Sequence, residues 1–496
     1  MSAGTAPFRV RKLERSVQKG SAAAVGLLAT VQVTLILAIT VVAIGLPAIG
    51  EDLGMRPGQL ALVSAGYGLA FSGLLLVGGR MADRWGPRRM LRAGLAGLAV
   101  ASVTAAVSPS FVSLLLSRLG QGVGAALAAP AAMALLGAVF PDRPRHARAL
   151  AWWGGLAPLG ATAGIVLSGL SAGLASWRWA FAVPAMVGAT ATALAGRLLP
   201  TGAATARARL DLPGALLFTT GVVSLSYALV TAGDRGWATA PVATCLMAAV
   251  AALAGFAAVE AVRPAPLVPP AVLRSPGRVT GLAVVTMAAA AHASVGFFLA
   301  LYLQQVRGLS PVATTAAFLP FLLPLPLAGP VAGRLLRRLP APAVAAGGLT
   351  TAAVGLLLIG RLEVDTPYAG TLLAGLLVFP AGVGATFAAA TVLAVEDTDR
   401  SQAGLAGGLV NTAIELGPAV GLALLVSLSG ARTARLLDAG WPAAAAATGG
   451  YRFALTTAAA VLAAAAVVTA GAVAAARRRD RVPPSDPHTS TWGRDS

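Results

Sequence analysis

Long apolar runs separated by short polar segments dominate the hydropathy pattern of this chain. Each run is close to the about 20 residues that a helix needs to cross about 30 Å of hydrocarbon, whereas the strands of a membrane barrel would show short alternating segments. We therefore predict an all-α polytopic membrane protein with 14 transmembrane helices, and 12 is the alternative if two weak spans do not insert. The predicted spans are 22–47, 58–79, 90–108, 111–138, 147–170, 177–199, 213–232, 240–261, 278–303, 312–334, 341–360, 367–394, 403–429 and 452–475.

The composition excludes a water-soluble protein. Only 11% of the 496 residues are charged and 57% are hydrophobic, whereas soluble domains carry about 25% charged residues. The single cysteine, Cys245, excludes an internal disulfide, and a chain with two lysines has no G-x-x-x-x-G-K-[ST] nucleotide loop. The three histidines are too far apart in sequence for a local metal motif. We expect no metal and no cofactor.

The distribution of positive charge predicts the orientation in the membrane. With a cytoplasmic N-terminus, 28 of the 37 lysines and arginines fall in cytoplasmic segments and eight in outer loops. This bias predicts that both termini are cytoplasmic, in a cell membrane. The net charge of +19 lies in short clusters between apolar runs, so we expect a lipid bilayer and no nucleic acid as a partner. The arginine-rich, lysine-poor composition suggests a bacterial source.

The most specific motif, G-R-M-A-D-R-W-G-P-R-R, lies between the second and third predicted spans. A carboxylate among four arginines can hold a helix end, because it accepts hydrogen bonds from guanidinium groups or from free N–H groups at a helix N-terminus. A plain positive loop would explain the arginines, but not the glycines and the aspartate at their spacing. The predicted gating residues of this loop are Gly79, Asp83, Arg84, Gly86, Arg88 and Arg89.

This loop resembles the signature of the major facilitator superfamily. Four further segments resemble its motifs, namely R-L-G-Q-G from 118, W-R-W-A-F from 177, Q-Q-V-R-G-L-S-P from 304 and the N-T pair at 411. With fourteen helices, the resemblance implies the drug:proton antiporter branch. It therefore implies a monomeric secondary transporter, not an enzyme, that exports a hydrophobic or amphipathic small molecule in exchange for protons.

An internal repeat supports two matching halves. The segment 329–338 echoes the first loop 250 positions later, with Gly333 in place of Asp83, although chance similarity of two Gly/Arg loops is the alternative. In this superfamily, such halves are related by an axis along the membrane normal. The predicted parts are a cytoplasmic basic arm (1–21), a six-helix bundle (22–200), an inserted helix pair (201–265), a second six-helix bundle (266–476) and a disordered cytoplasmic tail (477–496).

Two other segments depart from the family pattern. In the first helix, Ala38 stands where the antiporter branch has an intramembrane aspartate, and Ala43 replaces an asparagine. In the fifth helix, Gly160 and Gly164 are retained and predict close helix packing, but Ser168 replaces a further glycine. These departures leave the direction of transport and the coupling ion open.

A few polar residues inside the spans are candidates for coupling or for the substrate cavity. A charged group in hydrocarbon costs at least about 2.5–3.5 kcal/mol, so such groups are candidates for a functional role. We predict that Glu415 carries the proton and that Arg118 is its electrostatic counterpart. Alternatively, Arg118 reaches outward to the interface, and Glu415 stays protonated and hydrogen-bonded. The other predicted cavity residues are Gln32, Gln121, His292 and Asn411, with a satisfied neutral donor as the alternative for the histidine.

Other functions remain open at this point. Facilitated uptake or exchange of a small metabolite is the alternative within transport. A polytopic membrane enzyme or a sensor is the alternative of another class. An enzyme would cluster acidic groups or histidines at one membrane face, and a sensor would bring a folded soluble domain.

Overall fold

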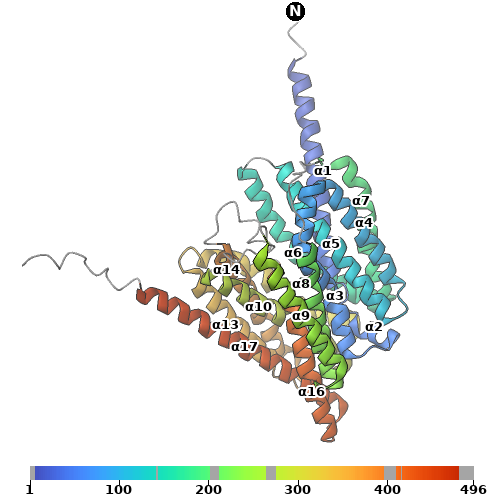
Figure 1. Cartoon of the computed structure of the whole chain (residues 1–496), viewed down its shortest axis with the longest axis vertical. Helices are drawn as coiled ribbons and strands as arrows, with labels where there is room; N and C mark the ends of the chain where they lie inside the picture. Colours follow the sequence, from blue (N-terminus) through green and yellow to red (C-terminus); the bar gives the residue numbers. More distant parts are fainter. Residues whose placement is uncertain are drawn as a thin grey trace, which may run out of the picture.

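The computed structural model describes residues 6–140, 143–201, 212–263, 275–395, 409–410, 412–414 and 416–479. All the regular elements among these residues are helices (Figure 1). Those of the first part of the chain are α1 (Ala6–Thr40), α2 (Leu46–Leu53), α3 (Pro57–Trp85), α4 (Pro87–Ala106), α5 (Phe111–Val139), α6 (Arg143–Leu174), η1 (Trp177–Phe181) and α7 (Ala182–Leu198).

In this first group, α5 packs against α3 and α4, while α1 packs against α6 and α7. The next two helices, α8 (Leu212–Arg235) and α9 (Ala240–Val262), pack on each other. Helix α8 also contacts α3 of the first group and α16 of the last, so this pair lies beside both parts of the molecule.

The remaining helices form a second group in which α14 contacts α10, α12 and α13, and α17 contacts α13 and α16. They are α10 (Pro276–Leu301), η3 (Tyr302–Val306), α11 (Pro311–Leu322), α12 (Pro324–Leu335), α13 (Ala341–Ile359), η4 (Tyr368–Leu372), α14 (Leu373–Val395), η5 (Pro418–Leu422), α16 (Ala423–Asp438) and α17 (Ala443–Arg479).

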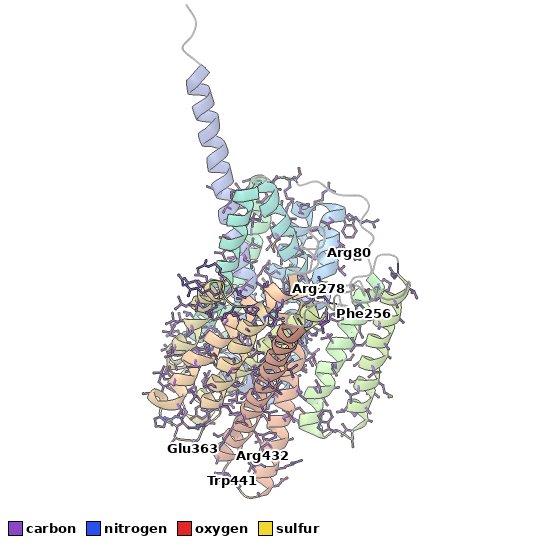
Figure 2. All side chains as sticks on the ribbon, turned by 90° about the vertical axis from the view of Figure 1, so that its left-hand side faces the viewer. Arg80, Phe256, Arg278, Glu363, Arg432 and Trp441 are labelled. Carbon is purple, nitrogen blue, oxygen red and sulfur yellow. The ribbon has the colours of Figure 1, made fainter. Side chains whose placement is uncertain are left out.

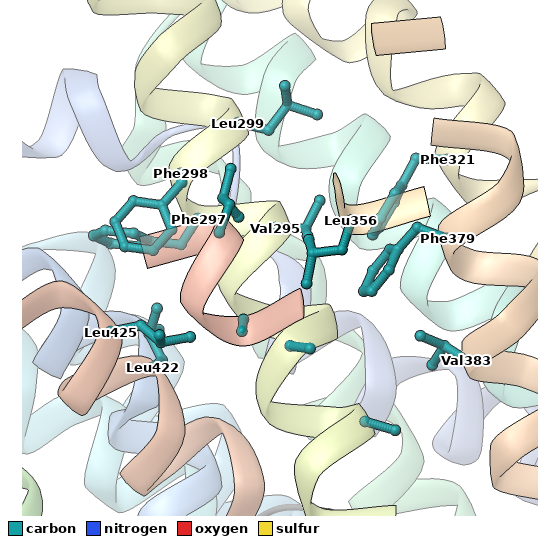
Figure 3. Packing of buried hydrophobic residues seen from close by; sticks show 14 of the residues in the cluster. Val295, Phe297, Phe298, Leu299, Phe321, Leu356, Phe379, Val383, Leu422 and Leu425 are labelled. Carbon is teal, nitrogen blue, oxygen red and sulfur yellow. The ribbon is translucent and has the colours of Figure 1, made fainter. Parts of the chain in front are cut away.

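Close helix packing depends on small residues. Because lipid tails are as apolar as leucine, helices in a membrane associate by tight packing rather than by hydrophobic burial. A Cβ on Gly281 would lie 2.8 Å from the carbonyl oxygen of Ala390 on α14. Larger side chains such as Phe298, Leu356 and Phe379 fill the space between helices of the second group (Figure 3).

Eleven of the described helices are long and apolar enough to cross a membrane. The predicted all-helical membrane fold is therefore confirmed, whereas the predicted number of fourteen is not. Two shorter apolar helices, Leu159–Leu174 and Leu216–Leu229, lie within α6 and α8.

Two predicted boundaries differ from the structure. The predicted first span, 22–47, is not one helix, because α1 ends at Thr40 and α2 starts at Leu46. Helix α1 also begins at Ala6, so most of the predicted arm is helical. Helix α17 starts at Ala443 rather than at 452, since its first residues are alanines, which have the highest helix propensity.

The two ends of the molecule differ in the residues that lie there. The end at which α3 and α12 finish and α10 begins is called the basic end here, and Arg80 and Arg278 lie toward it (Figure 2). Glu363 and Trp441 lie toward the opposite end. In Figure 1, α17 diverges from α1 toward the basic end.

Candidate functional site

The break between α1 and α2 is the centre of a polar cluster. Residues 41–45 form turns, and Pro47, near the start of α2, has no N–H to donate. A helix end leaves backbone carbonyls and N–H groups without partners, and such groups are costly in hydrocarbon. Side chains from other helices must therefore supply these hydrogen bonds.

Arg118 on α5 supplies donors to the end of α1. Its Nη1 donates to the carbonyl oxygen of Ala38 at 2.6 Å, and its Nη2 donates to that of Ile39 at 3.2 Å. The Nε group donates to the carbonyl oxygen of Val63 on α3 at 3.2 Å. The guanidinium also lies 5.4 Å from the ring centre of Tyr67, within the range of a cation–π interaction. One side chain thus ties α5 to α1 and α3.

Gln121 orients this arginine. Its Oε1 accepts a hydrogen bond from Arg118 at 2.9 Å, and its Nε2 donates to the hydroxyl of Ser102 at 2.8 Å. Both Arg118 and Gln121 are 0% exposed. The sequence predicted that they line the substrate cavity and that Arg118 pairs with Glu415. In this conformation Arg118 and Gln121 are both buried, and the guanidinium group of Arg118 donates to backbone carbonyls of the first group of helices.

Ser168 on α6 satisfies the other side of the break. Its hydroxyl oxygen accepts hydrogen bonds from the N–H groups of Ile44 at 3.1 Å and Gly45 at 3.0 Å. The sequence pattern identified Ser168 only as a substitution for a motif glycine and did not predict this role. The signal was present, because a hydroxyl in an otherwise small-residue motif indicates a backbone group that needs a partner.

Gly160 and Gly164 lie where α6 packs closely on α1. A Cβ on Gly160 would lie 2.6 Å from the carbonyl oxygen of Val33, and one on Gly164 would lie 2.7 Å from that of Leu37 and clash with the hydroxyl of Thr40. These two glycines therefore allow backbone contact between the helices at the turn of α1 that precedes the break.

Gln304 joins the break to the second group of helices. It lies in the π-helical turn η3, and its Nε2 donates to the carbonyl oxygen of Ile44 at 2.9 Å. Nearby, a Cβ on Gly173 of α6 would lie 2.7 Å from a methyl group of Val312 on α11. The two groups of helices are thus in close contact toward the opposite end. Sequence reasoning recorded Gln304 as part of a motif but assigned it no role.

His292 lies in an aromatic stack. Its ring is nearly parallel to that of Phe321, with centroids 4.9 Å apart, and to that of Phe379, with centroids 6.2 Å apart. Its Nδ1 is buried and has no hydrogen-bond partner among the described residues. An unpartnered Nδ1 does not say which ring nitrogen carries the proton, so the coupling role of His292 and its satisfied-donor alternative both stay predictions.

The other predicted cavity residues are less informative. Gln32 is half-buried on α1. Asn411 and Glu415 lie outside the described residues. The predicted proton carrier therefore stays a prediction from the sequence.

The basic loop is built around a glycine turn. Gly86 has φ of +91°, a conformation that favours glycine, and it both ends α3 and starts α4. A Cβ on Gly79 would lie 3.7 Å from that of Pro130, an ordinary contact, so packing does not require a glycine there. By accessible surface, Asp83, Arg84 and Arg89 are exposed residues. Neighbouring protein atoms still remove part of the water around the Asp83 carboxyl, which raises its pKa above the ordinary value.

Arg88 has a different task from its neighbours. Its Nη1 donates to the carbonyl oxygens of Leu199 at 3.1 Å and Gly196 at 3.4 Å. One turn later, Nε of Arg92 donates to that of Thr192 at 3.2 Å. Arg88 therefore supplies donors to carbonyls at the end of α7, which favours cations, and Arg92 binds the same helix further from its end.

At the opposite end, Asp52 accepts hydrogen bonds from Arg178 and from the indole N–H of Trp177 at 3.1 Å. The Arg178 guanidinium and this indole hold the pKa of the Asp52 carboxyl below its ordinary value. A cavity of about 470 Å³ lies between η3, α11 and η4, with Tyr302, Arg307 and Tyr368 among its lining residues. It belongs wholly to the second group of helices.

Comparison with known proteins places these features in a family. The family model described as Major Facilitator Superfamily matches residues 27–422. The puromycin resistance protein of Streptomyces alboniger is 38% identical over 86% of each chain. The cephamycin export protein of Amycolatopsis lactamdurans is 36% identical over 79% of this chain and 82% of its own length. The tetracenomycin C resistance and export protein of Streptomyces glaucescens is 32% identical over 81% and 74%.

Solved structures show the same fold. A peptide transporter POT in complex with sulfate superposes with a TM-score of 0.65 at 16% identity, over 93% of this chain and 94% of its own. A bacterial homologue of the human lysosomal transporter Spinster, in an inward-facing and unoccupied conformation, gives 0.64 at 15% identity, over 94% and 99%. Since the family model and the relatives cover most of the chain, this multi-pass membrane protein belongs to the major facilitator superfamily, in the drug-exporter branch that its motifs predict.

Proposed function

We propose that this protein exports an antibiotic-like, hydrophobic or amphipathic small molecule across a bacterial cell membrane by alternating access. The observation that carries this proposal is the similarity, over 86% of each chain, to a protein named for puromycin resistance. The relatives named for cephamycin export and for tetracenomycin C export support the same direction of transport. The protein acts as a transporter and not as an enzyme.

The fourteen-helix arrangement is part of this proposal. Three further helices, α4, α6 and α8, join the eleven candidate spans. Helix α4 carries arginines in its first turns, which lowers its mean hydropathy without shortening it. The basic end is then cytoplasmic together with both termini. The protein works as a monomer of two six-helix halves with α8 and α9 between them.

The α1 break and Gln304 form the gate at the outer end. Gln304 and the close α6–α11 contact hold the two halves together there, while α17 diverges from α1 toward the basic end. This arrangement supports a state that is closed to the outside. Opening to the outside requires the Gln304 amide to leave the carbonyl of Ile44. The basic loop around Asp83 acts at the other end of the same cycle.

Gln304→Leu is expected to shift the protein toward the outward-open state. Leucine has a similar size but no donor, so the carbonyl of Ile44 loses its partner from the other half. A hydrogen bond of this kind contributes about 0.5–1.5 kcal/mol, which corresponds to an about two- to tenfold shift in the ratio of the two states. Spin labels on the outer ends of α2 and α11, in a Cys245→Ser background, would measure the distance distribution.

Gln305→Leu is the matched control, because Gln305 is the exposed neighbour in the same turn. An unchanged distribution in Gln304→Leu, or an equal shift in the control, would contradict the assigned gate.

Coupling to protons completes the proposal. Glu415 carries the proton in place of the aspartate missing at Ala38. His292 is the second candidate for the proton carrier, because it is half-buried and its Nδ1 has no hydrogen-bond partner among the described residues.

Expression in an exporter-deficient bacterial host tests the function. We expect the protein to lower susceptibility to puromycin or to another compound of an antibiotic panel. Inverted vesicles should then accumulate that compound only with a proton gradient. Glu415→Gln should abolish the dependence of uptake on the proton gradient. His292→Gln measures the same dependence for the second candidate group. No change in susceptibility across the panel would contradict export, and gradient-driven uptake by Glu415→Gln would contradict only the proton assignment.

A further inference from the structure

The second copy of the basic motif, at the end of α12, carries three arginines that have no partner among the residues that the structure describes. Arg334, Arg337 and Arg338 are exposed, and none of their guanidinium groups makes a hydrogen bond or ion pair with a residue that the structure describes. In the first copy, by contrast, Arg88 donates to carbonyls of α7. The second copy also has Gly333 where the first has the carboxylate of Asp83. Its positive charge is therefore left uncompensated by the part of the chain that the structure describes.

Two of these arginines share a helix face with exposed apolar residues. Positions four, seven and eleven residues apart fall on one side of an α-helix, which places Arg334 and Arg338 in line with Leu327 and Val331. The helical path continues past Leu335, since the N–H groups of Leu336 and of Leu339 donate to the carbonyls four residues earlier, each at 2.8 Å. Leu327 is 67% exposed and Val331 is 52% exposed. Leu323, also exposed, extends this apolar ridge by one turn.

The ridge has the length of one lipid leaflet. From Leu323 to Arg334 the helix rises by about 16 Å at 1.5 Å per residue, and half of the about 30 Å hydrocarbon core is about 15 Å. An acyl chain that lies along the ridge therefore brings its headgroup to the arginines. Guanidinium groups one turn apart can hold a phosphate by charge-assisted hydrogen bonds, and basic clusters next to a membrane helix attract anionic lipids.

We propose that the apolar ridge of α12 and the arginine cluster Arg334, Arg337 and Arg338 form a binding site for an anionic phospholipid. The acyl chain packs against Leu323, Leu327 and Val331, and the phosphate binds the arginines. The site lies on the exposed face of α12, opposite the face that packs on α14 through Ala328 and Ala332. It is independent of the export proposal and of the cluster at the α1 break.

Native mass spectrometry of the purified full chain tests this site. Dioleoyl phosphatidylglycerol and dioleoyl phosphatidylcholine are titrated separately into delipidated protein. We expect the anionic lipid to bind more tightly, and the combined variant Arg334→Gln, Arg337→Gln and Arg338→Gln to weaken its binding by about tenfold or more. Binding of phosphatidylcholine should stay as in the unmodified protein.

A matched triple variant keeps the test specific. Arg432→Gln, Arg435→Gln and Arg452→Gln removes the same charge from exposed positions at the opposite end and should leave binding unchanged. Dihexanoyl phosphatidylglycerol, which cannot follow the ridge, and inorganic phosphate should both bind more weakly than the dioleoyl lipid. Equal binding of the two dioleoyl lipids, equal loss in the two triple variants, or equal binding of the short-chain lipid or of free phosphate would overturn the proposal.

Discussion

Arg118→Ala is expected to abolish export and to destabilise the fold more than the other single changes proposed here. The substitution removes the donors of two backbone carbonyls at the end of α1, those of Ala38 and Ile39. The carbonyl of Val63 lies inside α3, where the intrahelical ladder supplies another donor. Each buried polar group left without a partner costs about 1–3 kcal/mol, and no water in the hydrocarbon replaces the lost donor. We therefore expect the free energy of unfolding to fall by about 3 kcal/mol or more. Thermal unfolding in detergent and export from vesicles measure the two effects.

Arg118→Lys separates charge from geometry. Lysine keeps the positive charge, but its single ammonium group does not reproduce the planar fork of a guanidinium. We expect an intermediate loss of stability and little export. Arg361→Ala is the control, because Arg361 is exposed and its side chain makes no hydrogen bond with a described residue. A melting temperature of Arg118→Ala equal to that of the unmodified protein would show that the α1 break does not depend on this arginine.

Gly164→Ala is the second change with a large expected effect. The added methyl group clashes with the Thr40 hydroxyl and comes within 2.7 Å of the carbonyl oxygen of Leu37. Overpacking of this kind costs about 1–3 kcal/mol. It also pushes α1 away from α6 near the N–H groups that Ser168 holds. We expect export to fall by tenfold or more, with a lower melting temperature, as measured by vesicle uptake and thermal unfolding.

Gly26→Ala is the matched control for this change. Gly26 lies in α1 as well, and a Cβ there meets nothing within 4 Å. Because alanine favours a helix over glycine by about 1 kcal/mol, the control should keep export and gain slight stability. If Gly164→Ala transports like Gly26→Ala, the close α1–α6 contact has no part in function.

Most of what the sequence predicted well concerns single segments. Membrane helices and the transporter family are confirmed, because run length and short motifs are local properties. The break after Thr40 was missed, since the run 22–47 is apolar on both sides of it and hydropathy contains no information on hydrogen bonds. The predicted pairing of Arg118 with Glu415 stays a prediction, because Glu415 lies outside the described residues.

The sequence by itself determined that this chain enters a bilayer as helices, because the transfer of an apolar segment depends on its own residues. Only the tertiary structure decided which groups form hydrogen bonds with the free backbone groups at the α1 break. Its carbonyl and N–H partners come from Arg118, Ser168 and Gln304, which are 50 to 186 positions apart in the chain. A hydrogen bond requires its two atoms to lie within about 3 Å of each other, and that proximity is set by the packing of four helices rather than by any one of them.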